Sequence, residues 1–111
     1  MRKKMSNFKP KPNRPKGPNE FDKIKFKVKK LEVGDTFYTY DRYKNHIIGF
    51  LQDGDTKLVA YKCWLIYKNR WGYYLNRLDC VLYEICSLYN LSDEDSKVLF
   101  DLNDVNSEGW I

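Results

Sequence analysis

The sequence predicts an α+β fold, in which a small curled antiparallel sheet of about five strands precedes two short C-terminal helices. Two observations lead to this prediction. Between residues 22 and 75, apolar residues recur at every second position in short runs separated by turn residues, as expected of strands with one buried face. From residue 78 onward the apolar spacing changes to three and four residues, which is typical of amphipathic helices.

The first predicted strand covers residues 22–31, with the sequence DKIKFKVKKL. Its apolar side chains alternate with Lys23, Lys25, Lys27 and Lys29, which indicates an exposed strand at a sheet edge. Alternate residues of a strand lie roughly 6.6 Å apart, so the lysines could follow a phosphate backbone. They could equally keep the edge from pairing with another molecule.

Four further strands are predicted, over about residues 36–43, 47–52, 57–68 and 71–75. Asp53-Gly54 predicts a hairpin of type I′, whose two central residues both need positive φ, and Asn69-Arg70 predicts a second tight turn. In the long strand, the odd positions form a continuous apolar face that consists of Val59, Tyr61, Cys63, Leu65 and Tyr67.

Two helices are predicted after these strands. The first carries one apolar stripe from Leu78 to Tyr89, although Val, Leu, Ile and Tyr would also suit a sixth strand over residues 81–89. Ser92 is the predicted N-cap of the second helix, and three acidic residues follow it where the helix dipole favours them. The predicted apolar side of this helix consists of Val98, Leu99, Leu102 and Val105.

The strand spacing and the segment Val33-Gly34-Asp35-Thr36-Phe37 resemble those of small SH3-like or Tudor-like barrels. The resemblance covers about residues 31–75. It implies that the curled sheet is an SH3-like barrel. It implies no particular activity, because one fold class supports many functions.

Charge is strongly segregated along the chain. Residues 1–30 contain 12 basic and two acidic residues, a net charge of +10, whereas residues 31–111 carry a net charge of −5. All four prolines lie in residues 1–20, which favours extended conformers and removes backbone donors. We therefore predict a disordered Lys/Pro-rich basic arm over residues 1–20 and a single small globular domain over residues 21–111.

The basic arm predicts contact with nucleic acid or another polyanion, because neutralising phosphates releases counterions. Contact with a protein, or a role as an inert solubilising tail, stays open. Together with the lysines of the first predicted strand, the predicted nucleic-acid-binding residues are Arg2, Lys3, Lys4, Lys9, Lys11, Arg14, Lys16, Lys23, Lys25, Lys27 and Lys29.

Several aromatic residues are predicted to lie opposite the core face, close to basic residues; they are Tyr38, Tyr40, Trp64 and Tyr74. Single-stranded nucleic acid needs rings for its bases and charges for its phosphates. Tyr and Trp are also enriched at protein interfaces, so the predicted partner-binding residues are Tyr38, Tyr40, Lys62, Trp64 and Trp110. Alternatively, these rings fill a barrel or lie beneath the helices.

Signals for catalysis and for metal binding are weak. His46 is the only histidine and has no paired nucleophile motif, and no glycine-rich phosphate loop is present. The three cysteines form no CxxC pair, and no apolar run approaches the ~20 residues that span a membrane. We therefore expect a non-enzymatic cytoplasmic protein without metal or cofactor.

Richness in Lys, Asn and Tyr suggests an AT-rich genome, such as that of a bacteriophage, whose protein would act in the host cytoplasm. Our first hypothesis is a small accessory protein that engages nucleic acid or a nucleoprotein machine through its basic arm and Lys-faced first strand. The alternative is an inhibitor or adaptor that docks on a host enzyme or polymerase through outward aromatics and the acidic second helix. The oligomeric state stays open.

Overall fold

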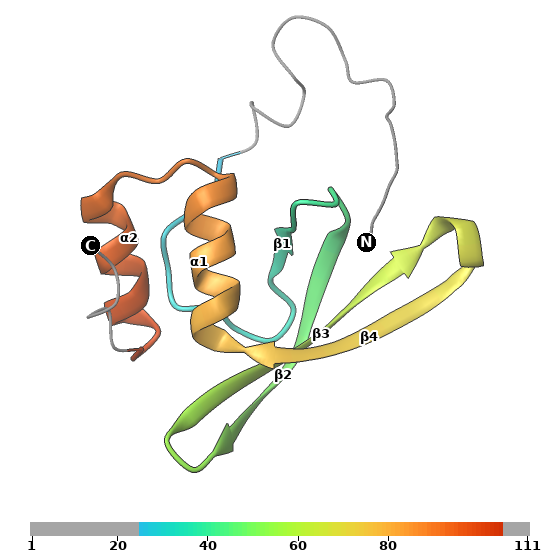
Figure 1. Cartoon of the computed structure of the whole chain (residues 1–111), viewed down its shortest axis with the longest axis horizontal. Helices are drawn as coiled ribbons and strands as arrows, with labels where there is room; N and C mark the ends of the chain where they lie inside the picture. Colours follow the sequence, from blue (N-terminus) through green and yellow to red (C-terminus); the bar gives the residue numbers. More distant parts are fainter. Residues whose placement is uncertain (1–24, 106–111) are drawn as a thin grey trace, which may run out of the picture.

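The computed structural model describes residues 25–105. Its elements are, in order, β1 (Thr36–Tyr38), β2 (Lys44–Asp53), β3 (Thr56–Leu65), the 3-10 helix η2 (Ile66–Lys68), β4 (Arg70–Arg77), α1 (Leu78–Leu88) and α2 (Asp93–Leu102). The fold is α+β, and the two helices follow the sheet in sequence, as predicted (Figure 1). The predicted disordered arm over residues 1–20 lies outside the described residues.

The sheet is an antiparallel meander with the strand order β1-β2-β3-β4. Its register places His46 beside Lys62, and Lys62 beside Tyr73, in one row across three strands. Within residues 25–105 the sheet has four strands rather than about five, and β1 and β4 do not pair with each other. Closure into an SH3-like barrel therefore stays a prediction.

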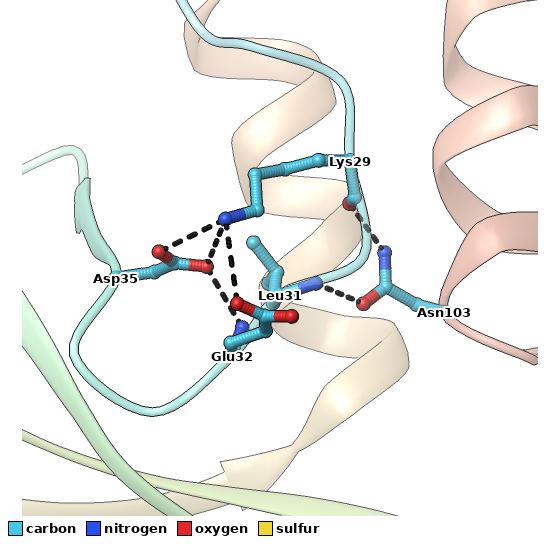
Figure 2. Close-up of polar contacts among 5 residues, drawn as sticks. All are labelled: Lys29, Leu31, Glu32, Asp35 and Asn103. Carbon is cyan, nitrogen blue, oxygen red and sulfur yellow. Dashed lines mark hydrogen bonds and ion pairs between the residues drawn. The ribbon is translucent and has the colours of Figure 1, made fainter.

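The strand predicted over residues 22–31 is wrong for the part that the structure describes, because residues 25–31 form no strand. The predicted alternation is nevertheless real, since Phe26 and Val28 pack against the core while Lys25 and Lys27 are exposed. The backbone bonds to a side chain instead of a neighbouring strand. The Leu31 N–H donates to Asn103 Oδ1 at 2.8 Å, and Asn103 Nδ2 donates to the Lys29 carbonyl at 3.1 Å (Figure 2).

Both predicted hairpin connections exist, but their central residues differ from the prediction. Asp53 pairs with Thr56, so the first turn is Gly54-Asp55, and of these two only Gly54 has a positive φ, of 62°. This arrangement matches a type II′ turn, which needs glycine at its first central position. In the second connection η2 ends at Lys68, and its C-cap Asn69 has a φ of 52°.

Strand β3 ends at Leu65, three residues before the predicted end, because η2 begins at Ile66. Tyr67 was predicted to continue the apolar face of the strand. It is instead 74% exposed in η2, so this prediction is wrong.

Residues 78–88 form a helix, which decides against a sixth strand. Ser92 is the N-cap of α2, as predicted, because its side chain accepts a hydrogen bond from the Asp95 N–H at 3.1 Å. The predicted apolar side of α2 is partly wrong, since Val98 and Leu102 are exposed. The helix is rotated so that it buries Ser96, Leu99 and Phe100, which follow the i, i+3, i+4 spacing.

The core lies between the helices and one face of the sheet. Four alternate residues of β3 point into it and are at most 8% exposed: Val59, Tyr61, Cys63 and Leu65. We call this side, with Gly72, Tyr74 and Asn76 of β4 beside it, the covered face. The connection between β3 and β4 extends away from both helices, so part of the sheet has no helix over it (Figure 1).

Candidate nucleic-acid interface

Neither α1 nor α2 lies on the opposite side of the sheet. Directly paired residues in antiparallel strands point to the same side, so the register assigns the side chains of this surface. Its central rows join Trp64 with Trp71, and His46 with Lys62 and Tyr73. We call this set the open face; it consists of His46, Lys62, Trp64, Trp71 and Tyr73.

The open face holds an accessible cluster of rings around Trp71. The Trp64 and Trp71 rings meet edge to face with centroids 5.4 Å apart, and His46 approaches Trp71 at 5.8 Å. Lys62 Nζ lies 4.4 Å from the centroid of the Trp71 ring, within the range of a cation–π interaction. Trp64 is 41% and Tyr73 65% exposed, so these rings can be reached by a ligand.

Basic and acidic residues occupy different parts of the folded domain, although the net charge of the domain is negative. Residues 56–78, which include β3, η2 and β4, contain five basic residues and no acidic residue. Residues 79–105, which include α2 and all of α1 except its first residue, contain seven acidic residues and one basic residue. Counting charge by segment of the sequence would have revealed this division.

Two of the five basic residues are occupied by ion pairs. Arg77 Nη2 lies 2.6 Å from Asp79 Oδ2, and Lys57 Nζ lies 3.5 Å from Asp104 Oδ2. Over the described range, Lys62, Lys68 and Arg70 form no ion pair. Of these three, Lys62 lies beside the exposed rings of the open face, whereas Arg70 pairs with Leu65 and lies on the covered side.

The structure brings together only some of the predicted site residues. Lys62 and Trp64 lie together on the open face. Tyr40 instead faces α1, where its hydroxyl contacts Ser87 Oγ. Tyr38 lies in β1, where its backbone N–H donates to Tyr89 Oη at 3.0 Å. Trp110 lies outside the described residues.

The assignment of Tyr74 to the outward side is wrong. Tyr74 pairs with Tyr61, and the two rings stack 5.7 Å apart on the covered face. The more apolar row of β4, with Trp71, Tyr73 and Leu75, faces solvent instead. Trp71 and Tyr73 were therefore not predicted as site residues, because the length of the preceding connection decides which row of β4 faces the core.

The three described lysines from the first predicted strand have different surroundings. Lys25 and Lys27 are exposed. Lys29 Nζ lies 3.0 Å from Asp35 Oδ2 and 3.9 Å from Glu32 Oε1, so it stabilises the turn before β1 (Figure 2). Although burial opposes ionisation, hydrogen bonds from Lys29 and from the Glu32 N–H lower the pKa of Asp35.

The remaining predicted nucleic-acid-binding residues lie outside the described part of the chain: Arg2, Lys3, Lys4, Lys9, Lys11, Arg14, Lys16 and Lys23.

The described residues contain few features of a reactive site. Burial raises the pKa of the free thiols of Cys63 and Cys86, which lowers their thiolate fraction at neutral pH. Cys80 is exposed, and partial desolvation together with the neighbouring Asp79 carboxylate raises the pKa of its thiol as well. Between residues 25 and 105, no group of three or more His, Cys, Asp or Glu side chains could hold a metal ion. No helix in this range has both the length and the apolar character to cross a membrane.

Comparison of the chain with protein-family models, with curated proteins and with solved structures finds no match.

Proposed function

We propose that this protein is a non-enzymatic cytoplasmic binding protein whose open face engages single-stranded nucleic acid. The observation that carries this proposal is the exposed cluster of Trp64, Trp71 and Lys62 on a sheet surface that neither α1 nor α2 covers.

The chemistry of the open face suits unpaired bases. Every base has a π-face, and stacking on an aromatic side chain contributes about 1–3 kcal/mol per base. Trp64, Trp71 and Tyr73 supply the exposed rings. Lys62 and the neighbouring hairpin cations supply charge for phosphates. A duplex hides its bases, so the rings favour a single strand.

The charge distribution would orient the ligand. Residues 79–105, with net charge −6, would repel phosphates from the helical side of the domain. The basic arm would add phosphate contacts through residues such as Arg2, Lys9 and Arg14, and would strengthen the salt dependence. Stacking requires an uncovered sheet face but not a closed SH3-like barrel, so the proposal holds whether or not the sheet closes.

Titration of the full chain with fluorescent oligonucleotides tests the proposal. Single-stranded DNA and RNA should bind more tightly than duplexes of the same length. Replacing Trp71 with Leu should weaken single-strand binding by about tenfold, whereas Trp71→Phe, which keeps a ring, should retain most of the affinity. A chain that begins at Phe21 should bind with a lower salt slope, because it lacks the basic arm.

The matched control is Val98→Ala, which removes an exposed apolar side chain on α2, away from the open face. Binding that does not change with Trp71→Leu or with salt would contradict the proposal. If a partner protein were instead retained after nuclease treatment and lost with Trp64→Ala, the open face would be a protein-docking surface. That result would favour the inhibitor or adaptor function.

A further inference from the structure

Strand β4 forms one edge of the sheet. It pairs with β3 on one side, and no strand between residues 25 and 105 pairs with its other side. An edge strand directs backbone N–H and C=O groups away from the sheet, where they can pair with a strand of another molecule. The outer edge of β4 is therefore a place at which the sheet can be extended.

β4 lacks the features that usually protect an edge strand from such pairing. Protected edges are very short, or they carry lysine, proline or a β-bulge. The opposite edge of the sheet, β1, has only three residues. β4 has eight residues, and its pairing with β3 runs from Arg70 to Arg77 without a shift of register. Residues 71–76 include neither a charged residue nor a proline, so this edge is long, regular and neutral.

The side chains along this edge provide apolar contacts for an added strand. Trp71, Tyr73 and Leu75 alternate along β4, point to the open face and are exposed. Directly opposite side chains in an antiparallel pair contact each other, and aromatic residues gain most from such contacts. An added strand would therefore cover part of this row as well as the backbone groups.

A second copy of the chain fits this edge because β4 can pair with itself. In a two-fold antiparallel pair, opposite residues point to the same side of the sheet, so the numbers of the paired residues differ by an even number. This condition excludes the register that sets Arg70 against Arg77 of the second copy, where like charges would repel each other. A pair centred on Tyr73 joins residues 70–76 of both copies. It places Tyr73 opposite itself and Trp71 opposite Leu75.

The ends of β4 favour this centre over its two neighbours. A pair centred on Tyr74 would engage Arg77, which directly precedes α1 and whose Nη2 lies 2.6 Å from Asp79 Oδ2. A pair centred on Gly72 would join only residues 70–74, because β4 begins at Arg70. The pair centred on Tyr73 joins a longer segment and sets each Arg70 against a neutral residue, Asn76.

We infer that this protein forms a symmetric dimer in which the outer edges of β4 pair antiparallel about Tyr73. The two four-stranded sheets then become one continuous sheet. Both open faces lie on the same side of it, because the two-fold axis is perpendicular to the sheet. The dimer forms without nucleic acid, so its existence does not depend on the proposed function.

Sedimentation velocity of the nuclease-treated full chain tests the dimer. From about 1 μM to about 200 μM protein, mass action should raise the average mass from 13.4 kDa towards twice this value. We expect a midpoint in the micromolar range, because one strand pair buries less surface than the roughly 1,600 Å² of a standard interface. A mass that stays at 13.4 kDa, or one that rises past the dimer, would overturn the inference.

A charge-swap experiment then locates the two-fold axis. Tyr73→Lys and Tyr73→Glu each place like charges opposite each other, so each should weaken dimerisation at least about tenfold. An equimolar mixture should restore the dimer, because the opposed charges then differ in sign.

The matched control is Tyr67→Lys, which changes an exposed tyrosine of η2 outside the edge and should dimerise like the wild type. Tyr73 is itself exposed, and the circular dichroism spectrum of each variant shows whether it is folded. Undiminished dimerisation of either Tyr73 variant alone, or failure of the mixture to dimerise, would overturn the inference.

Discussion

The two faces of the same strand, β3, have opposite roles. Val59 and Tyr61 are at most 8% exposed and pack in the core with residues of both helices, whereas Trp64 is 41% exposed on the open face. Both rows contain large apolar residues, so hydrophobicity alone does not distinguish them. The helices decide which row becomes core, and the other row is left with rings and a cation that the fold does not need.

The faces also differ in the charge that surrounds them. On the open face Lys62 forms no ion pair within the described range, whereas Arg70 pairs with Leu65 and therefore lies on the covered side, where Asp41 and Glu84 line a pocket. The open face thus carries a cation beside its exposed rings, whereas the covered side carries charges of both signs.

The largest expected difference between the faces concerns stability. Replacing Phe100, which is 0% exposed, with Ala should lower the free energy of unfolding by about 3–5 kcal/mol. Trp71→Ala removes a larger side chain but should cost only about 1 kcal/mol, mainly from the aromatic contact with Trp64. Chemical denaturation of both variants measures this difference. Equal losses would show that the open face is part of the core.

A second prediction concerns the segment that replaces the predicted first strand. Asn103→Ala should destabilise the fold by about 1–3 kcal/mol, because it leaves the buried Leu31 N–H without its acceptor. The matched control is Gln52→Ala, which removes an exposed amide that bonds to the Gly54 carbonyl. Hydrogen exchange at Leu31 should accelerate in the Asn103 variant. Unchanged exchange would mean that residues 25–31 are held by the packing of Phe26 and Val28.

These residues also show what a sequence can predict. The Ser92 cap and the apolar stripe of α1 were predicted because their spacing is local and is satisfied within one helix. The segment before β1 was mispredicted as a strand because its backbone bonds to a distant side chain instead of a neighbouring strand. The acceptor of the Leu31 N–H is Asn103, which is 72 residues away. A local pattern reports which side chains are buried, but not what buries them.

The candidate sites depend still more on distant residues. Lys62 and Trp64 were predicted from alternation within β3, whereas Trp71 joins them only through the strand register. A pocket on the covered side, lined by Asp41, Tyr74 and Glu84, was not predicted because these residues come from separate parts of the chain. Their composition alone, two acids and an aromatic residue, is common throughout this sequence.

A third prediction compares lysines in the two charge environments. Lys62→Gln should lower the slope of log affinity against log salt by about 1 for single-stranded nucleic acid, if Lys62 contacts one phosphate. Lys97→Gln removes an exposed lysine from α2, where acidic residues predominate, and should leave the slope unchanged. Titrations at several salt concentrations provide the slopes. A larger effect from Lys97 would place the ligand on the helical side.

The smallest expected effect concerns the dependence of stability on pH. The ion pair with Lys29 lowers the pKa of Asp35 in the folded state, despite the opposing effect of burial. Its contribution is therefore fully present above the unfolded value of about 3.9, and it is lost as the pH falls through the lower folded pKa. We expect about 1 kcal/mol or less, because both side chains are partly exposed.

Denaturation of the wild-type protein and of Asp35→Asn between pH 7 and pH 3 measures this contribution. The variant should be less stable at pH 7, and the difference should shrink as the pH approaches 3. Arg77 likewise lowers the pKa of Asp79 against the effect of burial, so some acid sensitivity should remain in the variant. A constant difference at every pH would mean that Asp35 acts through the geometry of its bond to the Glu32 N–H rather than through its charge.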